Sequence, residues 1–259
     1  MKKLLFFISV FSFLFLVEPA AMAQQMASMQ QGAMPWSTKS KQAKALTDKA
    51  IRHILNVERE QAYHDFKAAA EMDQGFVLPN AFLANLSSGE TRKTQGVKTN
   101  AISAGKTEAE NLLASMVAET ATPDSRREAW AKLHTMYPND RFVGHYYAIS
   151  RTNVDEQFTA MSDYIRKFPE EPAMYNMMGY YYLTEKKDNA KAKEYFEKYI
   201  QLYPDGANPY DSMGEFYMLT GDTENAEKYY KLALEKYPFM VSSIQALEKI
   251  NAGKKKAEN

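Results

Sequence analysis

The chain has 259 residues, which allows one large or two small domains, and its apolar content of 45% is enough to build a core. Lysine plus arginine and aspartate plus glutamate each total 32, a balance that lacks the basic imprint of nucleic-acid-binding proteins. There is no cysteine, which excludes disulfides, thiolate zinc sites, cysteine nucleophiles and a lipid anchor carried by cysteine.

Residues 1–23 have the pattern of a signal peptide. Lys2 and Lys3 precede an apolar run from Leu4 to Val17, and residues 21–23, Ala-Met-Ala, have the small-x-small pattern of a signal-peptidase site. The run is too short to cross a bilayer core of ~30 Å comfortably. We expect cleavage near Ala23-Gln24 and a soluble mature protein, periplasmic or secreted, with no membrane span. An uncleaved membrane anchor is the alternative.

Residues 24–40, QQMASMQQGAMPWSTKS, predict a flexible linker because they are rich in Gln, Met and Ser and lack periodicity. Trp36 is expected to hold the end of this linker against the first helix. Thioethers such as those of Met26, Met29 and Met34 suit Cu(I). Their irregular spacing and the lack of a nearby histidine favour the linker instead. We therefore expect no metal and no cofactor.

From about residue 41 onward, apolar residues recur at three- and four-residue steps, which predicts helices almost throughout. Helix breakers follow at intervals of 30 to 35 residues, at Gly75, Gly105, Pro138, Pro169, Pro204 and Pro238. Such regular spacing indicates internal repeats, each formed by a pair of helices.

The two C-terminal units align residue by residue. In the first unit the matched positions are Tyr175, Met178, Gly179, Tyr182, Ala192, Phe196 and Pro204; in the second, in the same order, they are Tyr210, Met213, Gly214, Tyr217, Ala226, Tyr230 and Pro238. Glycine inside a helix costs roughly 1 kcal/mol relative to alanine. The matched glycines therefore predict a close contact between the two helices of each unit.

These positions resemble the tetratricopeptide repeat, a helix-turn-helix unit of 34 residues. The resemblance implies an all-α fold, a right-handed superhelical solenoid of about six helix pairs. We expect a degenerate helical region at 41–136 and repeat units at 137–170, 172–205 and 207–238. Residues 239–259 would form a capping helix and a charged tail, because the last repeat would otherwise expose an apolar face.

No pattern of catalytic residues is evident. The four histidines fall in different units, and the chain has no HExxH motif, Gly-rich phosphate loop or GxSxG elbow. Asp211 and Glu215 share one helical face because they are four residues apart, and a cation site is the alternative there to a solvated face. We expect a protein that is not an enzyme.

The resemblance also implies a concave groove, lined by the first helices, that binds an extended peptide or a partner's helix. Carried over by position, its residues are Arg141, His145, Asn176, Tyr180, Asp211 and Glu215. The expected function is a non-enzymatic protein–protein interaction scaffold of the cell envelope. One alternative is an accessory factor of an outer-membrane assembly or nutrient-uptake complex. Another is a small-ligand binder or enzyme within residues 77–136.

Overall fold

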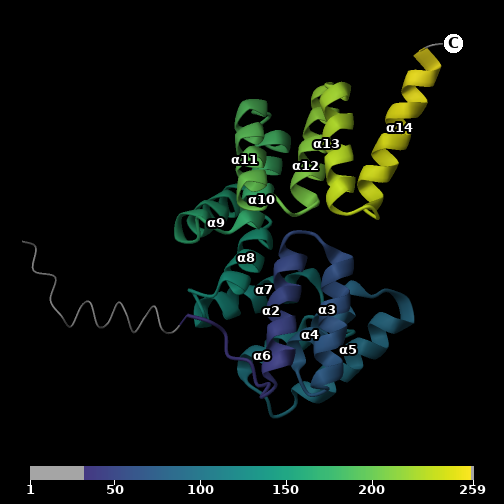
Figure 1. The fold of residues 1–259 in the computed structure, drawn as a ribbon. Helices are drawn as coiled ribbons and strands as arrows, with labels where there is room; N and C mark the ends of the chain where they lie inside the picture. The colour runs from purple at the N-terminus through teal and green to yellow at the C-terminus, as the bar shows by residue number, and fades with distance from the viewer. Residues whose placement is uncertain (1–31, 258–259) are drawn as a thin grey trace, which may run out of the picture.

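The computed structural model describes residues 32–257, so the predicted signal peptide and residues 24–31 of the predicted linker lie outside the described residues. The described part contains thirteen α-helices and no strand (Figure 1). None of these helices is both long and apolar enough to span a membrane.

Twelve of these helices form six consecutive pairs. The pairs are α2 (Lys41–Leu55) with α3 (Arg59–Met72), α4 (Val77–Leu86) with α5 (Gly89–Ser103), α6 (Glu108–Ser115) with α7 (Pro123–Met136), α8 (Arg141–Ile149) with α9 (Val154–Lys167), α10 (Pro172–Thr184) with α11 (Asn189–Leu202), and α12 (Asn208–Thr220) with α13 (Thr223–Lys236). Helix α14 (Val241–Ala257) packs on the last pair (Figure 1). The predicted all-α repeat fold is confirmed.

The helix ends follow from local sequence. Asn153, Asp188 and Asp222 precede α9, α11 and α13, and each side chain accepts a hydrogen bond from a backbone N–H of the first turn. These caps satisfy donors that have no partner within the helix. Gly221 ends α12 with φ of 88°, a left-handed conformation that favours glycine. The turn between the two helices therefore ends at equivalent residues in the fourth, fifth and sixth pairs.

The hydrophobic core is divided along the array rather than gathered at one centre. A large cluster that includes Phe66 and Trp130 joins α2 to α8, and smaller clusters follow around Met178 and Met213. The last cluster joins Tyr230 of α13 to Ile250 of α14. This division is typical of a solenoid, in which each unit buries its apolar face on the next.

Residues 32–40 differ from the flexible linker expected there. Met34 is fully buried, and its backbone N–H donates to Asp140 Oδ2 at 2.7 Å. Trp36 packs edge-on against Phe76 and Phe142 at centroid distances of 6.1 and 6.4 Å. The segment has no helical period because it binds across several helix pairs in extended form. Met34 therefore belongs to the core and is not free to hold a metal.

Candidate functional site

Two glycines bring the helices of the fifth and sixth pairs into close contact. A β-carbon added at Gly179 would lie 2.6 Å from the ring of Phe196, and one at Gly214 would lie 2.8 Å from the ring of Tyr230. Both rings are buried. Because protein interiors are close-packed, neither ring can move aside without opening the core. The glycines thus set the distance between the first and second helices of these pairs, α10 to α11 and α12 to α13. The first helices, α10 and α12, are called the inner helices below.

Each inner helix is also bonded to the preceding unit. The Tyr175 hydroxyl donates to the backbone carbonyl of Pro169 at 2.9 Å, and the Tyr210 hydroxyl donates to that of Pro204 at 3.0 Å. Equivalent residues of successive units thus make the same bond. These bonds orient α10 and α12, and with them the side chains on their inner faces.

The fourth unit does not offer its two predicted groove residues to a ligand. Arg141 is exposed, but its guanidinium forms ion pairs with Glu170, at 2.6 Å, and with Glu171. His145 is buried against the ring of Tyr164, and burial lowers the pKa of His145 to about 4. His145 is therefore a neutral core residue at neutral pH, unlike the groove position expected for it.

The other four predicted groove residues lie together. Asn176 and Tyr180 of α10 and Asp211 and Glu215 of α12 all line one cavity of about 570 Å³. The Tyr180 hydroxyl donates to Glu215 Oε2 at 2.5 Å, which joins the two inner helices across 35 residues. Asn176 is buried, and its Oδ1 has no hydrogen-bond partner within the described part of the chain. This cavity, called here the inner cavity, is the candidate site.

Asp211 has a structural role in addition to its place in the cavity. Its Oδ1 accepts hydrogen bonds from the hydroxyls of Ser242, at 3.0 Å, and Ser243, at 2.5 Å, in the first turn of α14. Burial raises the pKa of the Asp211 carboxyl, while these two serine bonds lower it. A carboxylate is favourable at the start of a helix. Asp211 therefore anchors the capping helix, whereas the sequence suggested a solvated face.

The opposite wall of the inner cavity comes from the N-terminal end of the chain, at the corner between α2 and α3. The Tyr203 hydroxyl donates to Glu58 Oε2 at 2.9 Å, and the Tyr237 hydroxyl donates to Glu60. Tyr203 and Tyr237 are equivalent residues that follow α11 and α13. At the same corner Val57 has φ of 65°, a strained conformation for a β-branched residue. The corner thus bridges two successive units and closes the inner side of the array.

Comparison with known proteins identifies the repeat. A family model described as the tetratricopeptide repeat matches residues 172–205 and 207–238. The chain thus carries two tetratricopeptide repeats. The match covers the two units that carry the paired glycines and tyrosines. No curated protein matches the sequence.

Solved structures of this fold are also similar to the chain. A tetratricopeptide repeat protein from Parabacteroides merdae superposes with a TM-score of 0.52 and 16% identity, over 89% of this chain and 91% of that one. A chain of the APC/C hetero-tetramer Cut9–Hcn1 superposes with a TM-score of 0.50 and 12% identity, over 92% of this chain and 49% of that one. Likeness at such low identity shows the fold alone.

A tetratricopeptide-repeat fold suggests a protein–protein interaction scaffold. The matching model is that of a repeat and not of a catalytic family. Within residues 32–257 no group of three or more His, Cys, Asp or Glu is placed to hold a metal ion.

Sequence reasoning missed the α2–α3 corner as a wall of the site. The corner lies in a degenerate unit, and no periodicity relates Glu58 or Glu60 to the tyrosines that bind them. The one available signal was the recurrence of Tyr-Pro at 203–204 and 237–238, which marks helix ends equally well.

Proposed function

We propose that the inner cavity binds a peptide segment of a partner protein, and that this chain is a non-enzymatic scaffold of the cell envelope. The observation that carries the proposal is that Asn176 and Tyr180 of α10 and Asp211 and Glu215 of α12 line one cavity. The Glu215 side chain is exposed there, and its carboxylate can accept a hydrogen bond from a bound peptide.

The charge of the inner cavity favours a basic partner. Four carboxylates line it, from Glu58, Glu60, Asp211 and Glu215, and Arg59 is the one cation among its lining residues. Each carboxylate accepts a hydrogen bond from a tyrosine or serine hydroxyl. A tyrosine or serine hydroxyl is a neutral donor, so its hydrogen bond does not cancel the negative charge of the carboxylate. A lysine or arginine of a partner would therefore meet a complementary field.

The rim of the inner cavity favours apolar side chains. Phe239 is 72% exposed, and Val57 and Val241 are also exposed. These are three of the seven large apolar side chains that are exposed among residues 32–254, for which side-chain burial is described. Apolar groups that gather at the edge of a cavity are typical of interaction sites. The best-fitting ligand is a peptide with both basic and apolar residues.

The cellular address is proposed from the N-terminal sequence. Two lysines, an apolar run and the Ala-Met-Ala pattern at 21–23 support export. A partner would then be met in the periplasm or outside the cell. Because the chain has no cysteine, it cannot carry a lipid anchor attached to cysteine, which supports export in a form without such an anchor.

Selection of peptides displayed on phage tests this proposal. Peptides selected by the protein should be rich in lysine or arginine beside apolar residues. Their binding should be lost in Glu215→Lys, which reverses one charge of the inner cavity. The matched control is Glu224→Lys, an exposed carboxylate on α13 outside the cavity, which should bind them normally. Equal loss in both variants, or selection of acidic peptides, would contradict the proposal.

A further inference from the structure

Residues 33–38, called here the strap, are held by three carboxylates that lie at the ends of three different helices. Each carboxylate accepts one hydrogen bond from the strap: Asp140 Oδ2 from the Met34 N–H at 2.7 Å, Glu110 Oε1 from the Ser37 hydroxyl at 2.5 Å, and Asp73 Oδ2 from the Thr38 hydroxyl at 2.6 Å. No backbone-to-backbone hydrogen bond joins the strap to the rest of residues 32–257. Side chains of the helical body therefore hold the strap, as a receptor holds a peptide.

Each of the three carboxylates is also fixed by its own helix end. Asp140 Oδ1 accepts the Val143 N–H at 2.9 Å and so caps α8. Glu110 Oε2 belongs to the capping box at the start of α6, and Asp73 Oδ1 accepts a backbone N–H just after α3. Local sequence thus places all three acceptors with or without the strap. A site that is already ordered binds a segment at a lower entropic cost.

The side chains of the strap alternate between the body and water. Ala33 and Pro35 are exposed, whereas Met34 is fully buried and Trp36 is half-buried. Successive side chains of an extended chain point to opposite sides, so two anchors enter the body from one side of the strap. The strap and α2 also line a cavity of about 890 Å³. Space for the strap to move therefore lies directly beside it.

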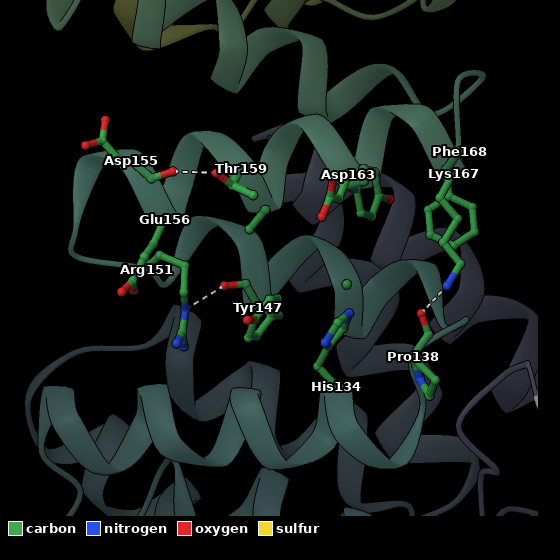
Figure 2. A pocket seen from close by; sticks show the side chains of 13 residues that line it. His134, Pro138, Tyr147, Arg151, Asp155, Glu156, Thr159, Asp163, Lys167 and Phe168 are labelled. Atoms are coloured by element: carbon green, nitrogen blue, oxygen red, sulfur yellow. Dashed lines mark hydrogen bonds between the residues drawn. The ribbon is translucent and has the colours of Figure 1, made fainter.

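The pocket of about 620 Å³ between α7, α8 and α9 is arranged differently (Figure 2). Arg151 donates to the backbone carbonyl of Tyr147, and Lys167 donates to that of Pro138. The Tyr147 ring is covered by His134, at a centroid distance of 4.1 Å, and by the Arg151 guanidinium at 4.6 Å. These cations and this ring bind one another, whereas the groups of the strap site bind a segment outside the helix pairs.

We propose that the strap site is a second peptide-binding site of this protein, and that the strap closes it in cis. The site takes an extended segment with a buried apolar side chain, an aromatic side chain two residues later, and hydroxyls at the next two positions. Residues 39–40 join the strap directly to α2, so its effective concentration at the site is about millimolar or higher. A partner segment of the same pattern has to displace the strap. None of the groups that hold the strap lines the inner cavity.

A synthetic peptide of residues 33–39, carrying a fluorescent label, tests this proposal on the purified protein. In the variant Met34→Ser/Trp36→Ser the strap loses both anchors, and this variant should bind the peptide. Wild type should bind it at least about tenfold more weakly, because its own strap competes. A peptide with the same two serines is the control and should not bind. A folded variant that leaves the peptide unbound, or binds both peptides equally, would overturn the proposal.

A further substitution assigns the binding to the strap site. Asp140→Ala, added to the strap variant, removes the acceptor of the Met34 N–H and should weaken peptide binding at least about tenfold. The matched control is Asp188→Ala, which also removes a helix cap, that of α11, but makes no contact with the strap. It should bind the peptide normally. Equal loss in the two variants would overturn the assignment.

Wild type supplies a second measurement that does not depend on the folding of a variant. The chain has two tryptophans, Trp36 and Trp130, so protein labelled with 5-fluorotryptophan gives two fluorine resonances. Unlabelled peptide above about millimolar concentration should move the Trp36 resonance to that of an exposed ring and leave that of Trp130 in place. An unchanged Trp36 resonance would overturn the proposal. A wild-type dimer in which Trp36 stays buried would overturn closure in cis and assign the site to the strap of a second copy.

Discussion

The hydroxyl of Tyr203 donates a hydrogen bond to Glu58 Oε2 across 2.9 Å, although the two residues lie 145 positions apart in the chain. Glu58 Oε2 also lies 2.6 Å from His53 Nδ1, so the bond belongs to a small network at the α2–α3 corner. Tyr237 repeats the contact one unit later, on Glu60. Repeats of a solenoid ordinarily contact only their neighbours. These two bonds instead close the inner side of the array and complete the inner cavity.

Removal of both hydroxyls should open this closure. In the double variant Tyr203→Phe/Tyr237→Phe the α2–α3 corner loses its two bonds to the C-terminal units. Because the chain has no cysteine, spin labels on cysteines introduced at the exposed Lys67 and Lys228 report the distance between α3 and α13. We expect the distribution of distances between the two labels to become longer and broader. The free energy of unfolding should fall by at most about 1 kcal/mol for each bond removed.

The matched control for this closure is Tyr175→Phe/Tyr210→Phe. It also removes two tyrosine hydroxyls, but their bonds run to Pro169 and Pro204 in neighbouring units. It should lower stability and leave the α3–α13 distance unchanged. The same distance change in both double variants would show that Glu58 and Glu60 do not hold the array closed.

Alanine at Gly179 should destabilise the protein although alanine is the better helix former. The gain in helix propensity is about 1 kcal/mol, but the added methyl would lie 2.6 Å from the buried Phe196 ring. Overpacking typically costs ~1–3 kcal/mol, so we expect Gly179→Ala to lower the free energy of unfolding by up to ~2 kcal/mol. A second substitution, Phe196→Leu, should reduce the penalty of the alanine.

Gly253 is the matched control for Gly179, because it is also helical but nothing lies within 4 Å of its added β-carbon. Gly253→Ala should leave stability unchanged or raise it by up to ~1 kcal/mol. Denaturant titration of both variants checks the pair of expectations. A neutral or stabilising effect at Gly179 would show that the two helices do not need their close approach.

His145 should make the fold sensitive to mild acid. Burial lowers the pKa of His145 from 6.5 to about 4, so the folded protein disfavours its protonated form. Its stabilising contribution is present above pH 6.5 and is lost as the pH falls toward 4, because the unfolded chain takes up the proton first. The loss across this window is about 3 kcal/mol. His145→Leu should lack this dependence when unfolding is measured from pH 7 to pH 4, and equal slopes would contradict a buried neutral histidine.

Asp211 and Asp222 should respond to pH in opposite directions. Burial raises the pKa of Asp211, so its protonated form favours the fold, and that contribution is lost as the pH rises from 3.8 through the folded pKa. Hydrogen bonds from Asn225 lower the pKa of Asp222, so its contribution is present above 3.8 and is lost as the pH falls. Relative to wild type, Asp211→Asn should gain stability as the pH rises above 3.8, and Asp222→Asn should lose stability as the pH rises toward 3.8 from below. Parallel pH profiles would contradict the two environments.

The parts of the fold that could be predicted from the sequence are those set by contacts between neighbouring units. Gly179, Gly214 and the aromatic residues around them repeat at a fixed spacing, so their period reveals α10 to α13. Four of the six predicted groove residues line one cavity, because their helix faces follow from position in the repeat. His145 was placed by the same rule and lies in the core instead, against the ring of Tyr164.

The remaining features depend on contacts that leave no period in the sequence. Met34 reaches Asp140, and Glu58 reaches Tyr203, across more than 100 residues. Asp211 and Ser243 meet because α14 packs on the last pair, which a pattern of polar residues does not reveal. Such long-range polar contacts are decided by tertiary packing rather than by local propensity.

Site-specific photocrosslinking in living cells tests the role of the inner cavity most directly. A photoreactive phenylalanine analogue replaces Phe239, the exposed ring at the cavity rim, or Val97, which is 67% exposed on α5 away from the cavity. We expect a discrete crosslinked partner from position 239, its loss when Glu215→Lys is added, and no such product from position 97. The same products from both positions, or a product at 239 that Glu215→Lys leaves intact, would contradict a partner-binding inner cavity.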